Sequence, residues 1–414
     1  VVLSNAKRPL IISGTSTGSQ NVIKAAANIS WKLSEKNRET GLVLTLPECN
    51  SLGLAMIGSR PLSQAFERVK KEGIETVFIL ENDLYQRGKV SEVNDFLKSS
   101  KRLIVLDHTN TPTAQQADLL IPAGTFAESD GMLVNNEGRA QRFFQVYEPG
   151  DSVQESWRWI LRIGTSVGNK KISAWENFED ITQALAQETG ILKSIENVSP
   201  PPSHRINGQR VPREPHRFSG RTAMLANVNV SEPKPPDDPD SSLSYTMEGF
   251  RGLPPSTMIP FFWSPGWNSV QSINKYQQEI GGPLRGGDPG IRLLEPVQDQ
   301  QVNYFRSILS TVKPADGSLL IVHLHHIFGS DELSQHAPGV AERSPKAYVL
   351  LNTKDAQRLN VAENQLLDFE IDGQPYQLPV KFSTEMPGDV AGLPYGLQGV
   401  PYVALPALAN LKYV

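Results

Sequence analysis

The sequence predicts an α/β protein, in which a doubly wound domain of parallel strands and helices is followed by a small β-barrel. Two observations carry this prediction. Over roughly the first 165 residues, short apolar strands alternate with amphipathic helices, the pattern of parallel strands joined by right-handed crossovers. Over roughly the last hundred residues, strand signals dominate and the helix signals are short.

The α/β domain is expected at residues 1–198. Short apolar runs predict its strands, at residues 9–13, 41–46, 74–80 and 102–107. Apolar residues at helical spacing predict the helices between them, at residues 21–33, 61–73 and 89–98. Pro61 suits a first helical turn and Gly73 a helix end. Two more helices are expected between residues 151 and 190, and Ser152 with Glu155 predicts a capping box at the start of the first.

The second half of the chain changes in character. Proline-rich residues 199–244 predict an extended connection, and residues 245–315 an ordered but irregular segment rich in Gly, Pro and aromatic residues. Residues 316–414 are expected to form the barrel. Its predicted elements are strands at 318–324 and 347–351, a short helix at 354–359, a hairpin at 365–382 and two or three further short strands. Asp372-Gly373 supplies the turn of the hairpin.

Composition and charge argue against several classes of protein. The formal net charge of −4, without a clustered basic stretch, argues against a nucleic-acid partner. Cys49 is the only cysteine, so the chain cannot form an internal disulfide or supply the four thiolates of an iron–sulfur cluster, and no histidine is spaced to activate it. No apolar stretch reaches the roughly 18–20 residues that span a bilayer. The chain opens on Val1 in the middle of a pattern, so we expect a piece of a longer polypeptide.

Two motifs outside residues 126–141 are weak candidates for a phosphate or metal site. Residues 14–19 (GTSTGS) could hold a phosphate at a helix N-terminus, but they lack the GK[ST] and GxGxxG patterns, so a plain strand-to-helix turn is favoured. His323 and His325 would share one face of a strand, near His326 and His336, and could bind a metal. No carboxylate or cysteine is placed to complete that site, so a structural role is favoured.

The stronger candidate is the polar run at residues 126–141, FAESDGMLVNNEGRAQ. Glu128 and Asp130 would face the same way in an extended segment and repel each other unless paired, and Arg139 and Arg142 are the obvious partners. Such a run predicts a rigid polar loop at the carboxyl edge of the sheet, where α/β proteins bind ligands. The residues alone leave an ordered structural loop and a ligand cradle both open.

Small and amide residues in the same run point to tight turns. Gly131 and Gly138 indicate positive φ angles or a close approach of the backbone. Asn135 and Asn136 can cap turns through their side chains.

The polar run and the segment before it resemble a motif of the molybdopterin-dependent oxidoreductases. The general form is T-x-T-A-x-x-A-D-[VL]-x-L-P-A, followed by E-x-x-G-T-[FV]-x-N-x-E-G-R-x-Q. The matching positions are Thr111, Thr113, Ala114, Ala117, Asp118, Pro122, Ala123, Glu128, Gly131, Asn135, Glu137, Gly138, Arg139 and Gln141.

Further segments are similar to one branch of that family, the G subunits of the proton-pumping NADH–quinone oxidoreductase, respiratory complex I. These segments are LPECNSLG at 46–53, TMEG at 246–249 and the tryptophan-rich residues 260–293. Residues 329–334 and 347–361 resemble the start of the C-terminal double-psi barrel of the family. The resemblance covers most of the chain except residues 199–240.

The resemblance implies a molybdopterin-oxidoreductase type of Rossmann-like domain followed by a double-psi barrel. In the family a pterin holds the metal, often with a Cys, selenocysteine or Ser ligand, and an iron–sulfur segment precedes the domain. The complex I branch implies that the pterin has been lost, and Met132 stands where the pattern usually has Thr. The cleft is then expected to be vestigial, with no catalytic, cofactor or metal ligand in this chain. Its candidate residues are Glu128, Asp130, Asn135, Arg139 and Arg142.

The same resemblance implies a structural role rather than a catalytic one. We expect a scaffold and docking part of the peripheral arm, supporting electron transfer from NADH to quinone through iron–sulfur clusters elsewhere in the parent protein. The partners would be other peripheral-arm subunits, on the cytoplasmic side of the bacterial inner membrane, without a membrane span or nucleic acid. The alternatives are part of an active molybdenum or tungsten enzyme, such as a formate dehydrogenase relative, and a free-standing binding module.

Overall fold

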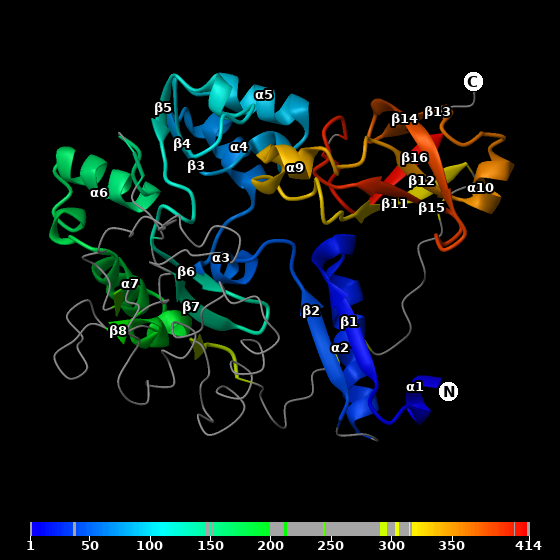
Figure 1. Cartoon of the computed structure of the whole chain (residues 1–414), viewed down its shortest axis with the longest axis horizontal. Coiled ribbons are helices and arrows are strands. Elements are labelled where there is room, and N and C mark those ends of the chain that lie inside the picture. The colour runs from blue at the N-terminus through cyan, green and yellow to red at the C-terminus, as the bar shows by residue number, and fades with distance from the viewer. Residues whose placement is uncertain are drawn as a thin grey trace, which may run out of the picture.

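A computed structural model shows an α/β portion and a barrel that lie side by side (Figure 1). It describes residues 2–35, 39–143, 145, 149–150, 152–198, 211–212, 243–244, 290–295, 303–305, 314, 317–400 and 402–411. Most of the expected connection at 199–244 and irregular segment at 245–315 lie outside the described residues. Among the described residues, no helix is both long and apolar enough to cross a membrane.

The first parallel sheet contains β1 (Leu10–Gly14) and β2 (Gly41–Thr45), in register from Leu10 opposite Gly41. Helix α2 (Gln20–Ser34) connects the two strands and packs mainly on β1. The short α1 (Val2–Asn5) precedes β1, and a 3₁₀ turn, η1 (Thr15–Thr17), links β1 to α2. The strand–helix–strand prediction for this region is confirmed, and residues 14–19 form the favoured turn.

The second parallel sheet contains β3 (Thr76–Leu80), β4 (Arg102–Asp107) and β5 (Leu119–Pro122), with β4 in the centre. Helices α4 (Leu62–Glu72) and α5 (Val90–Ser99) cover one face and bury a core around Val93 and Val105. The α/β class is confirmed, but the described strands form two separate parallel sheets rather than one doubly wound sheet.

A third, antiparallel sheet occupies the predicted polar loop. Strands β6 (Gly131–Val134) and β7 (Arg139–Phe143) form a hairpin, and β10 (Ile291–Arg292) adds to β7. We call residues 126–143 the polar hairpin. Helix α3 (Ser51–Ile57) packs beside β6, and both were outside the predicted elements.

Two helices follow the polar hairpin, as expected. They are α6 (Ser156–Ser166) and α7 (Phe178–Glu188), with 3₁₀ segments η4 (Ile172–Ala174) and η5 (Gly190–Asn197) after them. The capping box predicted at Ser152 and Glu155 is wrong. Gln154 pairs with Ala123 in a β-bridge, which keeps the backbone extended until Glu155, itself the residue that caps α6.

The capping box of this region lies instead at the start of α7. The Asn177 side chain accepts a hydrogen bond from the Asp180 N–H at 3.0 Å, and the Asp180 carboxylate accepts one from the Asn177 N–H at 3.2 Å.

The barrel prediction is confirmed. Six strands close in the order β11-β15-β12-β14-β13-β16. Their bounds are Ser318–Leu324 (β11), Val349–Asn352 (β12), Leu366–Ile371 (β13), Gln374–Ser383 (β14), Val390–Pro394 (β15) and Ala407–Leu411 (β16). The short helices are η7 (Ser334–His336), α9 (Pro338–Ala341) and α10 (Thr353–Arg358). A two-residue parallel pair, β8 (Val211–Pro212) with β9 (Leu243–Ser244), lies outside the barrel.

The hairpin β13–β14 closes through Asp372 and Gly373, which both have positive φ angles, as a two-residue turn requires. Its alternating residues Leu378 and Val380 are buried in the barrel core with Phe369.

Candidate functional site

The main cavity near the predicted ligand edge is a cleft between the α/β portion and the barrel. It has a volume of about 500 Å³. Its wall is formed by Thr15, Ser16, Gly18, Thr45, Leu46 and Pro47 at the carboxyl ends of β1 and β2, and by His323, His325, Tyr395, Tyr402, Val403 and Leu405 of the barrel. We call this cavity the interdomain cleft.

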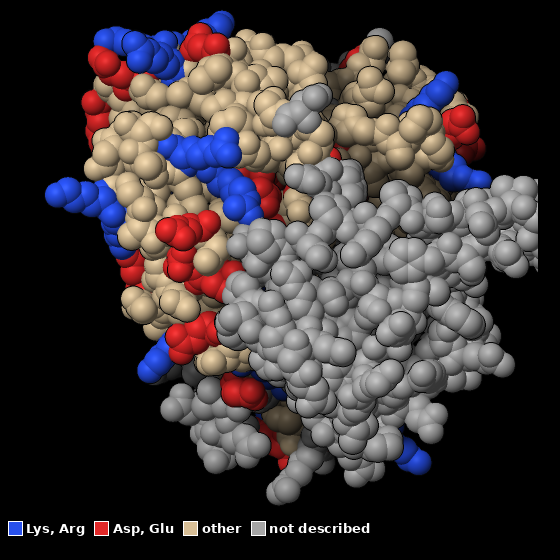
Figure 2. Space-filling view, turned by 60° about the vertical axis from the view of Figure 1, so that its left-hand side comes forward, with Lys and Arg blue, Asp and Glu red and all other residues tan. Residues whose placement is uncertain are grey.

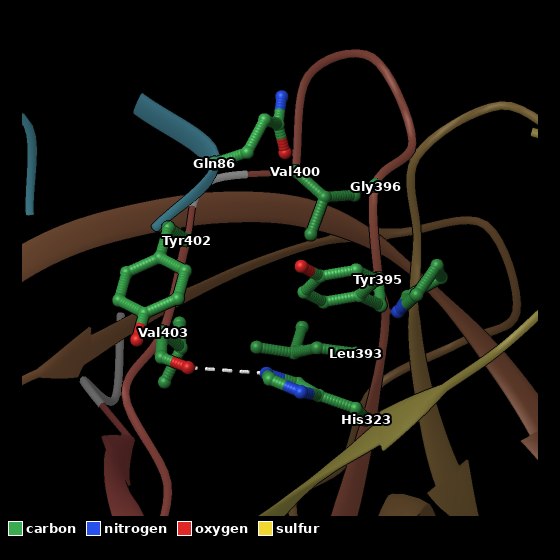
Figure 3. Close-up of a pocket in the computed structure, with 9 residues that line it drawn as sticks. Gln86, His323, Leu393, Tyr395, Gly396, Val400, Tyr402 and Val403 are labelled. Carbon is green, nitrogen blue, oxygen red and sulfur yellow. Dashed lines mark hydrogen bonds between the residues drawn. The ribbon is translucent and has the colours of Figure 1, made fainter. Parts of the chain in front are cut away.

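Two histidines of the barrel flank one tyrosine in this cleft. The ring centroids of His323 and His325 each lie 5.2 Å from the Tyr395 ring, and 6.5 Å from each other. His323 Nε2 lies 3.1 Å from the carbonyl oxygen of Val403, the contact drawn in Figure 3. Burial lowers the pKa of His323, and the neighbouring His325 lowers it further, so the imidazole is neutral at pH 7.

A much smaller pocket lies beside the cleft and shares His323, Tyr395 and Tyr402 with it (Figure 3). Its volume of about 10 Å³ is room for about one water molecule. Burial raises the pKa of both tyrosines, so their hydroxyl groups stay protonated and can donate or accept hydrogen bonds.

The other two histidines of the predicted cluster, His326 and His336, do not line this cleft. His326 Nε2 lies 2.9 Å from the hydroxyl of Tyr348, and His336 belongs to η7. Within the described ranges, no group of three or more His, Cys, Asp or Glu side chains is arranged to hold a metal ion. Cys49 is an exposed thiol.

Arg87 joins the α/β portion to the barrel beside the cleft. Its guanidinium donates to the hydroxyl of Tyr395 at 2.7 Å and forms ion pairs with Glu48 at 3.4 Å and Glu332 at 3.6 Å. The guanidinium also lies 3.4 Å from the side-chain oxygen of Asn82. One cation therefore holds groups from the loops after β2 and β3 and from two loops of the barrel.

Glu332 sits in an acidic surrounding. Burial raises its pKa to about 6, with further upward contributions from Asp83, Asp107 and Glu48, while Arg87 acts in the opposite direction. The region thus holds a carboxylate that changes charge close to physiological pH.

The structure pairs two of the predicted site residues with each other. Asp130 and Arg142 form an ion pair at 3.5 Å, with each side chain only 1% exposed. Arg142 also donates to the carbonyl of Phe143 at 2.8 Å and lies 4.2 Å from the Phe178 ring centroid. The Asp130 carboxylate accepts a second bond from the Gln145 N–H at 3.0 Å.

Glu128 and Arg139 have different partners from those that the sequence predicted. Glu128 accepts hydrogen bonds from the N–H and hydroxyl of Thr125, at 2.9 and 3.0 Å, and so closes its own turn. Arg139 lies 3.8 Å from Glu137. Because the chain turns back at residues 135–138, Arg139 is carried to the far end of the hairpin from Glu128.

Asn135 and the two glycines act as predicted. The Asn135 side chain accepts bonds from the N–H groups of Glu137 and Arg139, at 3.0 and 3.1 Å. Gly138 has a φ of 75°. At Gly131, a Cβ atom would lie 2.2 Å from the Phe143 ring, so any larger residue would force this ring to move.

None of the five predicted site residues lines the interdomain cleft. Arg142 lines a separate cavity of about 290 Å³ with Met132, Glu179 and residues of α7 and η5. The vestigial-cleft assignment of these residues stays a prediction. The cleft is lined instead by residues of the two weaker candidate motifs, residues 14–19 and His323 with His325.

Polar residues of the family motifs that precede the polar hairpin in the sequence form hydrogen bonds between neighbouring segments. Thr113 donates its hydroxyl to Asp83 at 2.6 Å and accepts the Leu84 N–H at 2.8 Å, which ties the loop after β4 to the loop after β3. Asp118 accepts the Leu103 N–H at 2.7 Å. Asn50 accepts the Val134 N–H at 2.8 Å and so fixes α3 to the edge of the hairpin.

Comparison with known proteins decides the relationship. Residues 2–164 match the family model described as "Molybdopterin oxidoreductase". The G subunit of NADH-quinone oxidoreductase from Pseudomonas fluorescens is 44% identical over 402 residues, which is 96% of this chain and 44% of that protein. The G subunit from Escherichia coli O6:H1 is 41% identical, over 99% of this chain and 46% of that protein. This chain is a homologue of the G subunit of NADH-quinone oxidoreductase.

The chain spans about half the length of the G subunits that it matches. Among solved structures, acetylene hydratase from Pelobacter acetylenicus aligns with a TM-score of 0.46 and 15% identity, covering 85% of this chain and 44% of that one.

Of the side-chain types that serve as metal ligands in the molybdopterin family, the described lining of the cleft contains one serine, Ser16. Among the described lining residues there is no thiol for the metal, and no lysine or arginine for a phosphate. The polar groups of the lining are hydroxyl and imidazole groups, which suit hydrogen bonding between two protein parts.

Proposed function

We propose that this chain is a structural and docking part of the G subunit in the peripheral arm of NADH:quinone oxidoreductase. In this role it supports electron transfer from NADH to quinone, coupled to proton translocation, without contributing a catalytic group. Iron–sulfur clusters would lie in a part of the parent protein outside this chain, since one cysteine cannot ligate a four-thiolate cluster. The identity of 40–44% to G subunits over nearly the whole chain supports this role.

One observation carries the proposal. The polar side chains of the family motif bond to this protein's own backbone and side chains. Glu128 accepts hydrogen bonds from Thr125, Thr113 binds Asp83, and Asn135 accepts the N–H groups of Glu137 and Arg139. Groups bound in this way have fewer donor and acceptor sites left for a cofactor.

The same proposal extends to the type of barrel, the partners and the location of the protein. We infer a double-psi barrel, supported by its mixture of parallel pairs, β11–β15 and β12–β14, with antiparallel ones. The expected partners are other peripheral-arm subunits, and the expected location is peripheral, on the cytoplasmic side of the bacterial inner membrane. On the face shown in Figure 2, acidic and basic side chains are interspersed, which suits a protein partner better than nucleic acid.

Elemental analysis of the full native polypeptide tests the proposal. Iron in cluster amounts without molybdenum or tungsten is the expected result. Near-stoichiometric molybdenum or tungsten would overturn it and favour an active pterin oxidoreductase, with the interdomain cleft as part of its site.

A further inference from the structure

The contact between the barrel and the α/β portion around Glu332 holds more negative than positive charge. Among the described residues, the α/β portion presents one guanidinium and three carboxylates to Glu332, those of Arg87, Glu48, Asp83 and Asp107. Arg87 forms ion pairs with both Glu48 and Glu332, at 3.4 and 3.6 Å, so its single charge is shared between two carboxylates. Closure of the barrel therefore brings a fourth carboxylate into an acidic surrounding, which disfavours its ionised form.

Two of these carboxylates are held in place by hydrogen bonds. Asp83 is buried and accepts the hydroxyl of Thr113 at 2.6 Å. Asp107 is also buried, and its Oδ1 accepts the Thr109 N–H at 2.9 Å. Its Oδ2 is buried without a hydrogen-bond partner in the described part of the chain. Since neither side chain is free to turn toward bulk water, the negative charges of both act on Glu332 with little screening.

The loop that carries Glu332 is bound to the loop after β15, so Glu332 moves with the barrel. The Ser330 hydroxyl donates to the carbonyl oxygen of Tyr395 at 2.6 Å. Arg87 holds both loops, because it pairs with Glu332 and donates to the Tyr395 hydroxyl at 2.7 Å. Tyr395 also lines the interdomain cleft, so the movement that separates Glu332 from Arg87 widens that cleft.

We propose that the contact of Glu332 with Arg87 is a proton-operated latch on the interdomain cleft. The latch is closed when Glu332 is protonated. When Glu332 is ionised, the barrel moves away from the three carboxylates, water reaches the charge, and the cleft widens.

The direction of the pH dependence follows from burial and from the neighbouring acids, which together raise the pKa of Glu332 from 4.5 to about 6. The closed form therefore binds the proton more tightly than an open form in which Glu332 is solvated. The latch is closed at low pH and loosens as the pH rises through about 6.

Two other titratable groups at the contact bear on this direction. His108 Nδ1 lies 3.9 Å from Asp107 Oδ1, and its protonation at low pH would offset part of the negative charge and so favour closure too. Tyr395 stays neutral, because burial raises the pKa of its hydroxyl. Substitution of Glu332 separates its contribution from that of His108.

Hydroxyl-radical footprinting of the full native polypeptide, read by mass spectrometry at pH 5 and pH 7.5, tests the proposal. Tyr402 is the reporter, because it is half-buried and lines the cleft. Tyr348 is the internal control: it is buried within the barrel, so its oxidation reports loss of barrel packing rather than opening of the cleft. Glu332→Gln removes the titrating group, and Glu342→Gln, at an exposed glutamate of the barrel, is the matched control variant.

In the unmodified polypeptide, oxidation of Tyr402 should be about two- to fivefold faster at pH 7.5 than at pH 5, with Tyr348 unchanged. Glu342→Gln should keep this difference and Glu332→Gln should abolish it, leaving Tyr402 slow at both pH values. Equal rates for Tyr402 at the two pH values in the unmodified polypeptide would overturn the proposal. So would an undiminished difference in Glu332→Gln, which would point to His108, or a parallel rise at Tyr348, which would mean that the barrel itself loosens.

Discussion

The Asp130–Arg142 pair stabilises the polar hairpin only while both partners are present. Each side chain is 1% exposed, so neither charge is solvated by bulk water. Arg142 also forms an ion pair with Glu179 at 3.5 Å. Removing Arg142 therefore takes the cation away from two carboxylates, and removing a carboxylate together with its cation costs less than removing the cation alone.

Arg142→Met should therefore lower the free energy of unfolding by about 3 kcal/mol, and adding Asp130→Asn should restore only part of it, because Glu179 keeps its charge without Arg142. Urea unfolding followed by circular dichroism measures both values. Lys71→Met, in the exposed pair with Glu67, is the control and should change nothing measurable. An equal loss in the single and double variants would show that the pair acts only through packing.

Glu332 gives the contact between the two portions a pH dependence. Its pKa of about 6 in the folded protein lies above the ordinary value of 4.5, so the folded state binds the proton more tightly. The stability that this provides is present at low pH and is lost as the pH rises through about 6.

Glu332→Gln should then raise the free energy of unfolding above pH 7 relative to the parent, by no more than about 1 kcal/mol, because the side chain is about a third exposed. Thermal unfolding at pH 4.5 and 7.5 measures the difference. Arg87→Met offers a second check: it removes the cation that lowers the pKa, so the pH window should move upward. A Gln variant with the parent's pH profile would contradict this assignment.

At the scale of elements, the turns of two hairpins each contain a glycine. The two glycines have similar φ angles but different neighbouring atoms. Gly138 and Gly373 have φ angles of 75° and 79°. A Cβ atom at Gly138 would lie 2.7 Å from Leu294, whereas at Gly373 no atom lies within 4 Å.

Gly138→Ala should destabilise the protein by about 2–4 kcal/mol, through left-handed strain and overpacking together. Gly373→Ala should cost only the strain, about 1–2 kcal/mol. Urea unfolding of the two variants, compared with the parent, separates the contribution of backbone strain from that of overpacking. Equal losses would mean that Leu294 moves aside at no cost.

Local signals predicted local elements well. The hairpin β13–β14 follows from its Asp-Gly turn and from alternating residues within eighteen positions of each other. The capping box at Ser152 and Glu155 failed because Gln154 is held extended by Ala123, a residue about thirty positions earlier. A pattern confined to four residues carries no information about such a distant contact.

At the scale of the molecule, a few polar contacts fasten the barrel to the α/β portion. Arg87 reaches Tyr395 and Glu332, and Lys89 forms an ion pair with Asp372 at 2.8 Å. These contacts join residues roughly 250 to 300 positions apart, so no sequence pattern could have selected Arg87 as a site residue. Residues 14–19 and His323 with His325 were recognised as separate weak candidates, but their meeting in one cleft could not be predicted for the same reason.

Replacing both Arg87 and Lys89 with Met should uncouple the two portions. The unfolding transition is expected to split, or to broaden strongly, because each portion keeps its own core. Calorimetry measures the effect. Arg358→Met is the control, since Arg358 pairs only with Asp355 and Asp389 inside the barrel among the described contacts. A single sharp transition in the double variant would place the coupling elsewhere.

The strand order of the barrel has a consequence for how the protein is made. Strand β11 pairs with β15 and β16, and β13 also pairs with β16. On the ribosome, the first sheet can pair β1 with β2 as soon as Thr45 has emerged. The barrel must wait for Ala407–Leu411, so one backbone edge of β11 stays unpaired while roughly eighty further residues are synthesised. Nascent chains stalled before residue 407 should therefore be the species that chaperones retain.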